Sequence, residues 1–230
     1  MRMRKKKYLE ERLGACSDNL ITVDRQDRNF NADTSPDEFF NLPKIFGNDN
    51  PLHLEIGCGK GQFACEIAER HPEINFLAVE KSANVIVAGC EKAKARGLKN
   101  LIFVKCSAEY LRCYLPKNSV ERLYLNFSCP FPKKKYASHR LTAINFLKVY
   151  DEFLKKDAEI HFKTDNRGLF EFSLEQLTQH GFSLKNVSLN LHESDFEGNI
   201  VTEYEQKFVS LGFPIYRLEA YREKGIEKDD

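Results

Sequence analysis

The feature that most constrains this chain is a regular alternation of short apolar runs with amphipathic stretches from residue 52 onward. The apolar runs predict strands at 52–56, 75–80, 101–106, 120–127 and 158–163. The intervening stretches have helical spacing, at 62–70, 83–96, 108–115, 138–156 and 168–180. Strands and helices that alternate in this way predict a parallel sheet with helices on both faces.

The two ends of the chain depart from this alternation. Residues 182–191 and 207–222 predict two final strands with no helix between them, so we expect an antiparallel hairpin at one edge of the sheet. Residues 51–230 are therefore expected to form one doubly wound, Rossmann-like α/β domain with a mostly parallel seven-stranded sheet. Residues 1–50 are polar and weakly periodic, and predict a basic and polar N-terminal arm laid over that domain.

Composition narrows the class of protein. Lys and Arg number 35 against 34 Asp and Glu, a net charge of +1 that excludes a uniformly basic surface. The seven cysteines form no CxxC pair and the six histidines show no ligand spacing, so we expect reduced thiols, no metal site and a cytoplasmic location. No apolar run approaches the ~20 residues of a membrane span, so no membrane association is expected.

A glycine-rich loop follows the first predicted strand. Gly57, Gly59 and Gly61 lie between that strand and a predicted helix, where the backbone can turn sharply and approach a ligand. Glu80 ends the second strand, 19 residues after Gly61. In a doubly wound sheet that carboxylate lies beside the first loop and can accept both hydroxyl protons of a ribose.

The ligand of this loop is a dinucleotide or S-adenosylmethionine. Glu55 opens the glycine signature, and a carboxylate there would repel the pyrophosphate of a dinucleotide. The ammonium and sulfonium of S-adenosylmethionine are positive and would tolerate it. The G-x-G-x-G spacing also differs from the dinucleotide pattern G-x-G-x-x-G. We therefore favour S-adenosylmethionine.

A second loop, after the fourth strand, combines aromatic rings with positive charge. Residues 126–140 contain Phe127, Phe131 and two prolines, and residues 133–140 carry four positive and no negative charges. Ligands of open α/β sheets bind at the carboxyl ends of the strands, so this loop overlooks the same crevice. Flat rings beside cations suit nucleobases on a phosphate backbone.

Four segments carry a family resemblance, and they occur in order: Glu-Ile-Gly-Cys-Gly-Lys-Gly-Gln-Phe at 55–63, Asn-Phe-Ser-x-Pro-x-Pro-Lys-Lys at 126–134, Thr-Asp-Asn at 164–166 and Thr-Glu-Tyr-Glu at 202–205. From about residue 52 to 222 the chain resembles the bacterial tRNA (guanine-N7)-methyltransferases. The resemblance implies a class I methyltransferase fold, S-adenosylmethionine as methyl donor, tRNA as partner, and transfer to N7 of the variable-loop guanosine 46.

The resemblance also implies roles for particular residues. Glu55, Glu80 and Ser107 match positions that bind S-adenosylmethionine, together with Gly57, Gly59 and Gly61 of the loop. The positions implied for tRNA contact are Lys133, Lys135, Tyr136, His139, Arg140, Asp165, Thr202, Glu203, Tyr204 and Glu205.

Cys129 is the departure with chemical consequences. The family pattern has Asp at this position, where it is regarded as the catalytic residue and a cofactor contact, so Cys129 is the candidate catalytic and cofactor-binding residue whose carboxylate is missing. Guanine N7 carries a lone pair and no proton, so methylation there needs no general base. Alignment of the reactants alone can supply roughly 7–11 kcal/mol of the barrier. We therefore expect a working enzyme that is slowed by the substitution.

Two other functions stay open on the sequence alone. One is a tRNA-binding relative that is catalytically impaired because Cys129 replaces the family Asp. The other is a methyltransferase that acts on a non-RNA substrate, for which the basic run at 133–135 would be incidental. The sequence also leaves the oligomeric state open, a homodimer included.

Overall fold

In the computed structural model, residues 6–23 and 39–223 are described. They form one eight-stranded sheet in the order β1-β4-β3-β2-β5-β6-β8-β7. The strand bounds are β1 Leu20–Thr22, β2 Leu52–Ile56, β3 Asn75–Val79, β4 Leu101–Lys105, β5 Val120–Asn126, β6 Leu154–Thr164, β7 Ser183–Ser188 and β8 Tyr216–Tyr221. Neighbouring strands from β1 to β6 are parallel, whereas β8 is antiparallel to both β6 and β7.

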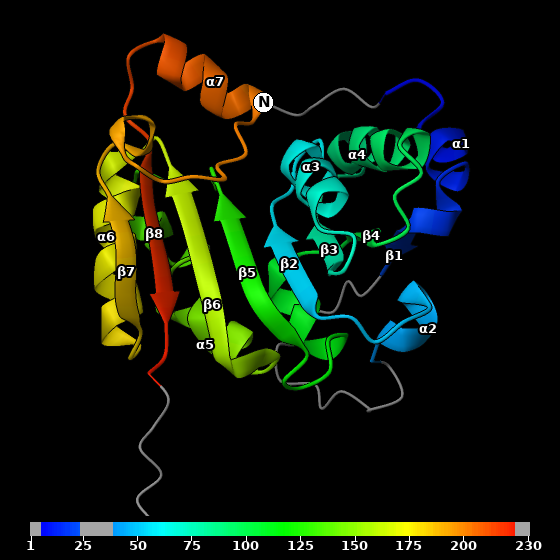
Figure 1. Ribbon diagram of the computed structural model, residues 1–230, viewed down its shortest axis with the longest axis horizontal. Coiled ribbons are helices and arrows are strands. Elements are labelled where there is room, and N and C mark those ends of the chain that lie inside the picture. Colours follow the sequence, from blue (N-terminus) through cyan, green and yellow to red (C-terminus); the bar gives the residue numbers. More distant parts are fainter. Residues whose placement is uncertain (1–5, 24–38, 224–230) are drawn as a thin grey trace, which may run out of the picture.

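Helices cover the two halves of this sheet from opposite sides. In Figure 1, α3 and α4 lie in front of β2, β3 and β4, while α5 and α6 lie behind β5, β6 and β8. α7 runs across the top of the molecule. The helix bounds are α1 Leu9–Gly14, α2 Leu42–Phe46, α3 Gln62–Arg70, α4 Ala83–Ala95, α5 Ile144–Asp151, α6 Arg167–Gln179 and α7 Glu203–Ser210. The doubly wound, mostly parallel sheet with an antiparallel edge is thus confirmed.

The sheet has one strand more than the predicted seven, because part of the N-terminal arm joins it. β1 pairs parallel with β4, Leu20 opposite Phe103. The arm is fixed by the Asn19 side-chain amide, which donates to the Cys90 carbonyl at 3.0 Å, and by an ion pair of 2.6 Å between Arg12 and Glu91. A three-residue strand with weak alternation gives too little pattern to be recognised from sequence.

Two predicted elements near the C-terminal half were wrong in part. The strand expected at 207–222 is divided: α7 occupies its first residues and β8 its last. Thr202 caps α7, because its hydroxyl accepts the Glu205 amide at 3.1 Å. The helix expected at 138–156 is reduced to α5, preceded by a 3₁₀ turn at Lys134–His139, and β6 already begins at Leu154.

The sheet is buried on both faces where it carries the glycine loop. Every residue of β2 and of β3 is buried, as expected for parallel strands between two helical layers. Across the described residues, no helix has both the length and the apolar character that crossing a membrane would need.

Two glycines let α3 and α4 approach each other over an aromatic ring. Gly61, which precedes α3, has φ +68°, and a Cβ on it would lie 2.8 Å from both the Gly89 Cα and the Phe103 ring. Backbone cannot move aside cheaply, so this contact excludes any side chain at residue 61 and fixes where α3 starts.

We therefore expect Gly61→Ala to destabilise the fold by about 2–5 kcal/mol, from the left-handed backbone and overpacking together. Gly97→Ala is the matched control, since Gly97 has φ +66° with no atom within 4 Å of a built Cβ. It should cost only about 1–2 kcal/mol. Urea unfolding of both variants measures the difference; equal losses would show that the helix contact is unimportant.

Candidate functional site

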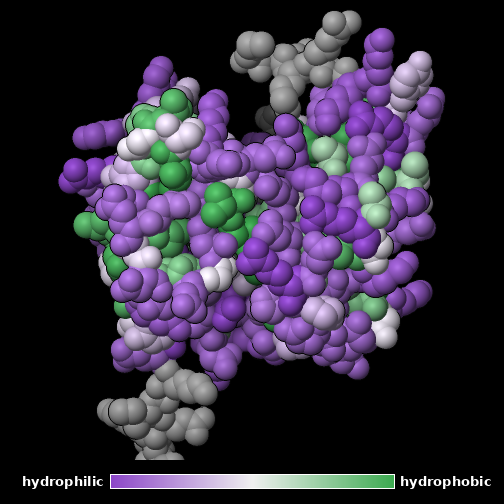
Figure 2. All heavy atoms as spheres, turned by 45° about the horizontal axis from the view of Figure 1, so that its top comes forward, coloured by the Kyte–Doolittle hydropathy of each residue, from purple (hydrophilic) through white to green (hydrophobic). Residues whose placement is uncertain are grey.

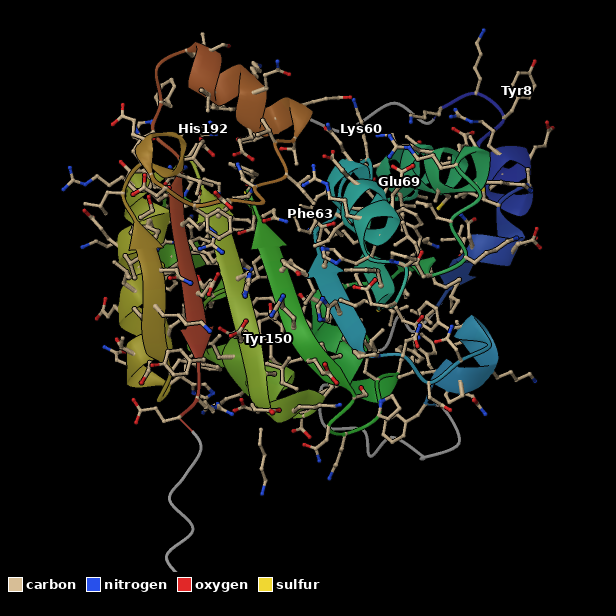
Figure 3. All side chains as sticks on the ribbon, in the orientation of Figure 1. Tyr8, Lys60, Phe63, Glu69, Tyr150 and His192 are labelled. Carbon is tan, nitrogen blue, oxygen red and sulfur yellow. The ribbon has the colours of Figure 1, made fainter. Side chains whose placement is uncertain are left out.

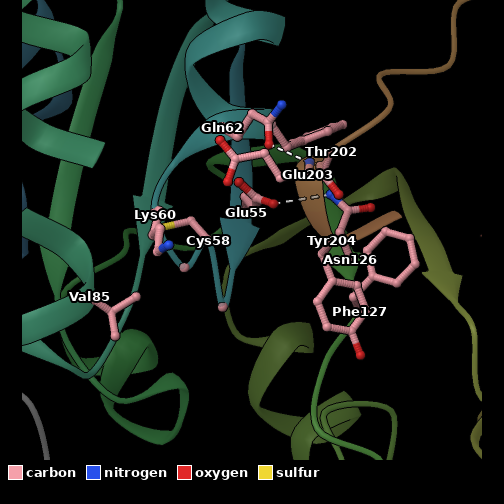
Figure 4. Close-up of a pocket in the computed structure, with 13 residues that line it drawn as sticks. Glu55, Cys58, Lys60, Gln62, Val85, Asn126, Phe127, Thr202, Glu203 and Tyr204 are labelled. Atoms are coloured by element: carbon pink, nitrogen blue, oxygen red, sulfur yellow. Dashed lines mark hydrogen bonds between the residues drawn. The ribbon is translucent and has the colours of Figure 1, made fainter. Parts of the chain in front are cut away.

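Two cavities join at the carboxyl ends of the parallel strands. The first has a volume of about 410 Å³ and lies between the glycine loop, the end of β5 and the start of α7 (Figure 4). The second, of about 300 Å³, lies between the ends of β3 and β4 and the loop after β5. Gly57 and Phe127 line both cavities. A ligand that occupied both cavities would therefore pass beside Gly57 and Phe127.

The glycine loop lines the first cavity and borders the second at Gly57. The Gly57 and Cys58 amides donate to the Val79 carbonyl at 2.8 and 3.0 Å, which ties the loop to the end of β3. Gly57, Gly59 and Gly61 all have positive φ, between 58° and 82°. The left-handed backbone at these three positions thus favours glycine, the residue type from which the ligand-binding loop was predicted.

Glu55 is a buried carboxylate at the base of the first cavity. Its Oε1 accepts the Asn126 side-chain amide at 3.1 Å, whereas Oε2 is buried without a hydrogen bond of ordinary geometry. Burial raises the pKa of Glu55 to about 7, although the Asn126 hydrogen bond and the nearby charge of Lys163 oppose this shift. A buried carboxylate favours a cationic partner, such as the ammonium of an amino-acid tail.

The second cavity brings together three other residues predicted to bind the cofactor: Glu80, Ser107 and Cys129. Glu80 is held in place because its Oε1 accepts the Ser82 amide at 2.8 Å. Much of the remaining lining is apolar, from Ile56, Val79, Ala108, Leu141 and Phe146. The Ser128 hydroxyl is also buried there without a partner. Apolar walls with a carboxylate and a free hydroxyl fit an adenosine, so the residues present fit S-adenosylmethionine across the joined cavities.

The loop after β5 presents its basic run to solvent. Lys133, Lys135, Tyr136 and His139 are exposed, and the His139 ring lies 5.6 Å from that of Phe131 and 5.9 Å from that of Tyr136. Arg140 instead turns back into the loop, where its guanidinium donates to the Pro130 and Phe131 carbonyls at 3.0 and 3.1 Å. It therefore supports the loop conformation, while the other four side chains remain accessible to a ligand.

Asp165 and Tyr204 meet at the mouth of the cleft. The Tyr204 ring packs 5.1 Å from the Phe127 ring. Burial raises the pKa of Tyr204, and the charge of Asp165 and its hydrogen bond with the tyrosine hydroxyl raise it further. Cys129 adds to the same shift. Asp165 and Cys129 thus both lie near the Tyr204 hydroxyl. Asp165 belongs to the 164–166 motif and Tyr204 to the 202–205 motif of the family resemblance, while Cys129 is the residue that differs from the family pattern.

The Thr202–Glu205 segment has two different faces. Thr202 and Glu203 line the first cavity, and the Glu203 amide donates to Gln62 Oε1 at 2.6 Å, which joins α7 to α3. Glu205 faces the opposite way: its side chain is fully buried and its Oε2 lies 2.7 Å from the Lys163 ammonium. Glu205 was predicted to contact tRNA, but in this conformation its carboxylate does not reach the surface.

Lys163 was not identified as a site residue from the sequence. It ends an apolar strand just before the Thr164-Asp165-Asn166 motif, and a lysine there is easily interpreted as exposed. The structure buries it beneath α7. The only available signal was its position next to the motif.

One set of possible metal ligands comes together within the described ranges, away from the cleft. Atoms of Glu159, His161 and Glu219 lie within 4.8 Å of one another. Both carboxylates are already paired with cations: Glu159 with Lys185 and, at 3.0 Å, with Arg122, and Glu219 with Arg217. Three side-chain cations thus surround the two carboxylates, and the prediction that the protein needs no metal stays a prediction.

Comparison with known proteins agrees with this geometry. A family model described as "Putative methyltransferase" matches residues 49–218. A tRNA (guanine-N(7)-)-methyltransferase of Bacillus cytotoxicus is 44% identical over 228 residues, which cover 99% of this chain and 100% of the relative. This chain belongs to the tRNA (guanine-N(7)-)-methyltransferase family. A family member from Bacillus velezensis is 49% identical over 175 residues, covering 76% of this chain and 81% of the relative.

Solved structures extend the likeness of fold beyond the family. The crystal structure of the 16S rRNA methyltransferase KamB superposes with a TM-score of 0.60 at 14% identity, covering 84% of this chain and 96% of that one. An antibiotic-related methyltransferase superposes with a TM-score of 0.57 at 20% identity, covering 82% and 94%. At these identities the likeness concerns the fold alone, and it confirms the class I methyltransferase fold that the family resemblance implied.

The raised pKa of Glu55 leads to a pH-dependent affinity. A cationic ligand binds the ionised carboxylate, so affinity should rise with pH through about 7 and then level off. For S-adenosylhomocysteine, calorimetry should give a dissociation constant about tenfold larger at pH 6 than at pH 8.

Glu55→Gln should remove most of that pH dependence. Glu80→Gln is the control, and should weaken binding at both pH values while leaving their ratio unchanged. An unaltered pH ratio in the Glu55→Gln variant would contradict the assignment.

Proposed function

We propose that this protein transfers a methyl group from S-adenosylmethionine to N7 of a guanosine in tRNA, the variable-loop guanosine 46. The observation that carries the proposal is the joined cavity. Its first part holds Glu55 and the glycine loop together with Tyr204, which interacts with Asp165, and its second part holds Glu80 and Cys129. Because tRNA is the substrate, we assign the protein to the cytoplasm.

The chemistry needs alignment more than proton transfer. When bound, S-adenosylmethionine supplies an electrophilic methyl group on a sulfonium. The N7 lone pair of guanine attacks without losing a proton, so the chain has no base to provide. Its tasks are to hold two reactants in line and to exclude water, which can contribute roughly 7–11 kcal/mol.

Each wall of the cleft has a role in this alignment. Glu55 pairs with the ammonium of the donor, and Glu80 binds its ribose, while Ser107 lies at the adenosine end. The Tyr204 and Phe127 rings, 5.1 Å apart at the mouth, offer an apolar surface to the guanine. The exposed Lys133 and Lys135 bind the tRNA backbone, with Tyr136 and His139 as ring surfaces beside them.

Cys129 removes a carboxylate from a place where positive charge develops. The guanine gains charge as the methyl group arrives, and a nearby anion stabilises that charge. Asp165 is a negative group in the same neighbourhood, since it and Cys129 both act on the Tyr204 hydroxyl. We propose that Asp165 supplies part of the missing stabilisation, so the enzyme remains active.

The test is nucleoside mass spectrometry of unmodified tRNA treated with the protein and S-adenosylmethionine. We expect 7-methylguanosine with the natural chain, and none from a tRNA in which guanosine 46 is replaced by adenosine. Cys129→Asp should raise kcat by as much as about 10²–10³, the usual worth of one preorganised group. Cys129→Ser, of similar size and without charge, is the control and should stay near the natural rate.

Product that forms with Cys129→Asp but not with the natural chain would refute the claim that this protein is active as it stands. Methylation at another base, with guanosine 46 untouched, would refute the assigned position.

A further inference from the structure

A buried ion pair lies directly behind the wall that α7 contributes to the cleft. The side chains of Lys163 on β6 and Glu205 on α7 are only 7% and 0% exposed, and the ammonium nitrogen lies 2.7 Å from Glu205 Oε2. Neither side chain lines the first cavity, although their neighbours do. The Lys163–Glu205 pair therefore supports residues that line the cavity and does not line it itself.

The ammonium of Lys163 and both carboxylate oxygens of Glu205 have hydrogen-bond partners in residues 199–205 and at His192. The Lys163 ammonium also donates to Asn199 Oδ1 at 2.9 Å and to the Ile200 carbonyl at 3.0 Å. Glu205 Oε1 lies 2.8 Å from both the Asn199 side-chain amide and His192 Nε2. Figure 3 shows His192 beneath α7. The segment 199–205 is thus held to β6 by a closed network.

The same lysine reaches the other walls of the cleft. Its backbone carbonyl accepts the Phe127 amide at 2.8 Å. Its ammonium lies 5.5 Å from the Phe127 ring and 6.0 Å from the Phe63 ring, which α3 directs toward the centre of the sheet (Figure 3). Lys163 therefore contacts three walls of the cleft: Phe127 in the loop after β5, Phe63 on α3, and residues 199–200 before α7.

Burial of two charges costs a large desolvation free energy, so the ion pair adds little net stability. Desolvation lowers the pKa of Lys163, and the Glu205 charge opposes that shift. A buried pair can often be replaced by apolar residues of similar volume without loss of stability, whereas removal of one partner is strongly destabilising. What apolar residues would not reproduce is the direction of the hydrogen bonds.

We propose that Lys163 and Glu205 are positioning residues for substrate binding: together they hold Thr202, Glu203 and Tyr204 at the rim of the cleft. This inference rests on the proposed function and deepens it, because it separates the Thr202–Glu205 motif into three residues that face the substrate and one that anchors them. As a direct tRNA ligand, Glu205 would have to abandon Lys163, Asn199 and His192 and leave a lysine charge buried alone.

The exposed surface around Tyr204 agrees with a role in facing the substrate. Tyr204 is 45% exposed, and its ring stacks 4.6 Å from that of Phe208, which lies 5.7 Å from the Phe213 ring. Apolar patches interrupt the hydrophilic surface on the side where α7 comes forward (Figure 2). An anchored α7 would present these rings in a fixed orientation.

The experiment compares Glu205→Gln with a double variant, Lys163→Met with Glu205→Met. Glu171→Gln, which breaks the exposed Arg167–Glu171 pair on α6, is the control. Measurements are the melting temperature, kcat and KM for tRNA, S-adenosylhomocysteine affinity, and hydrogen exchange of the amides in 199–210.

For Glu205→Gln we expect kcat/KM for tRNA to fall by about 10², as misplacement by a fraction of a helical turn does. Exchange should accelerate in 199–210 and stay unchanged in β2, and S-adenosylhomocysteine affinity should change by less than about threefold, far below that loss. The double variant should regain the melting temperature and yet keep the loss of kcat/KM. Glu171→Gln should leave all measurements unaltered.

Three results would overturn the proposal. A double variant that regains both melting temperature and kcat/KM would make the pair merely structural. A Glu205→Gln variant that loses activity with unchanged exchange in 199–210 would make Glu205 a direct ligand, and one with normal activity would make it unimportant. If the natural chain methylates no tRNA, the proposed function fails, while the exchange measurement still decides whether the pair anchors α7.

Discussion

The site depends on the register of three neighbouring parallel strands. Pairing of β2 with β5 and of β5 with β6 brings Glu55, Asn126 and Lys163 into one hydrogen-bonded row: Asn126 lies two residues beyond the register partner of Glu55, donates to Glu55 at 3.1 Å, and is itself the register partner of Lys163. Glu205 continues the row from α7. The order of carboxylate, amide, ammonium and carboxylate places each charge beside a polar group that can compensate it.

The two halves of the cleft are held in place by different kinds of contact. On the cofactor side, backbone geometry is fixed by glycines and by amide contacts with Val79. On the substrate side, α7 and the loop before it are attached through side chains, chiefly those of Lys163, Gln62 and Asn199. A register shift of one residue in any of the three strands would turn one of these side chains to the other face of the sheet. The hydrogen bonds that position Glu55 and Glu205 would then be lost.

Much of the cofactor half could be predicted from the sequence, because it depends on local patterns. The strand at 52–56, the three loop glycines and the acid at residue 80 follow from hydrophobic period, backbone freedom and chain order, and the structure has all of them at one edge of the sheet. The joining of both cavities at Gly57 follows from the same order.

The substrate half was harder to predict because it is decided by contacts between distant residues. Residues 207–210 contain apolar side chains compatible with a strand, whereas the structure has them in a helix that Thr202 caps and that the contact of Glu205 with Lys163 fixes to β6. Likewise β1 exists because Arg12 and Asn19 hold the arm to α4. No short window of sequence contains either pair.

The position of β8 between β6 and β7 has a further consequence. Because β8 is antiparallel to both, β7 runs parallel to β6 and ends at the same edge as the catalytic strands. The connection that follows, residues 189–215, must therefore emerge over the cleft, and it contains α7. Connecting segments tolerate change in length and sequence better than the strands that they join. Changes within this one connection can therefore alter part of what the enzyme recognises, while β2, which carries Glu55, and β3, which ends just before Glu80, stay unchanged.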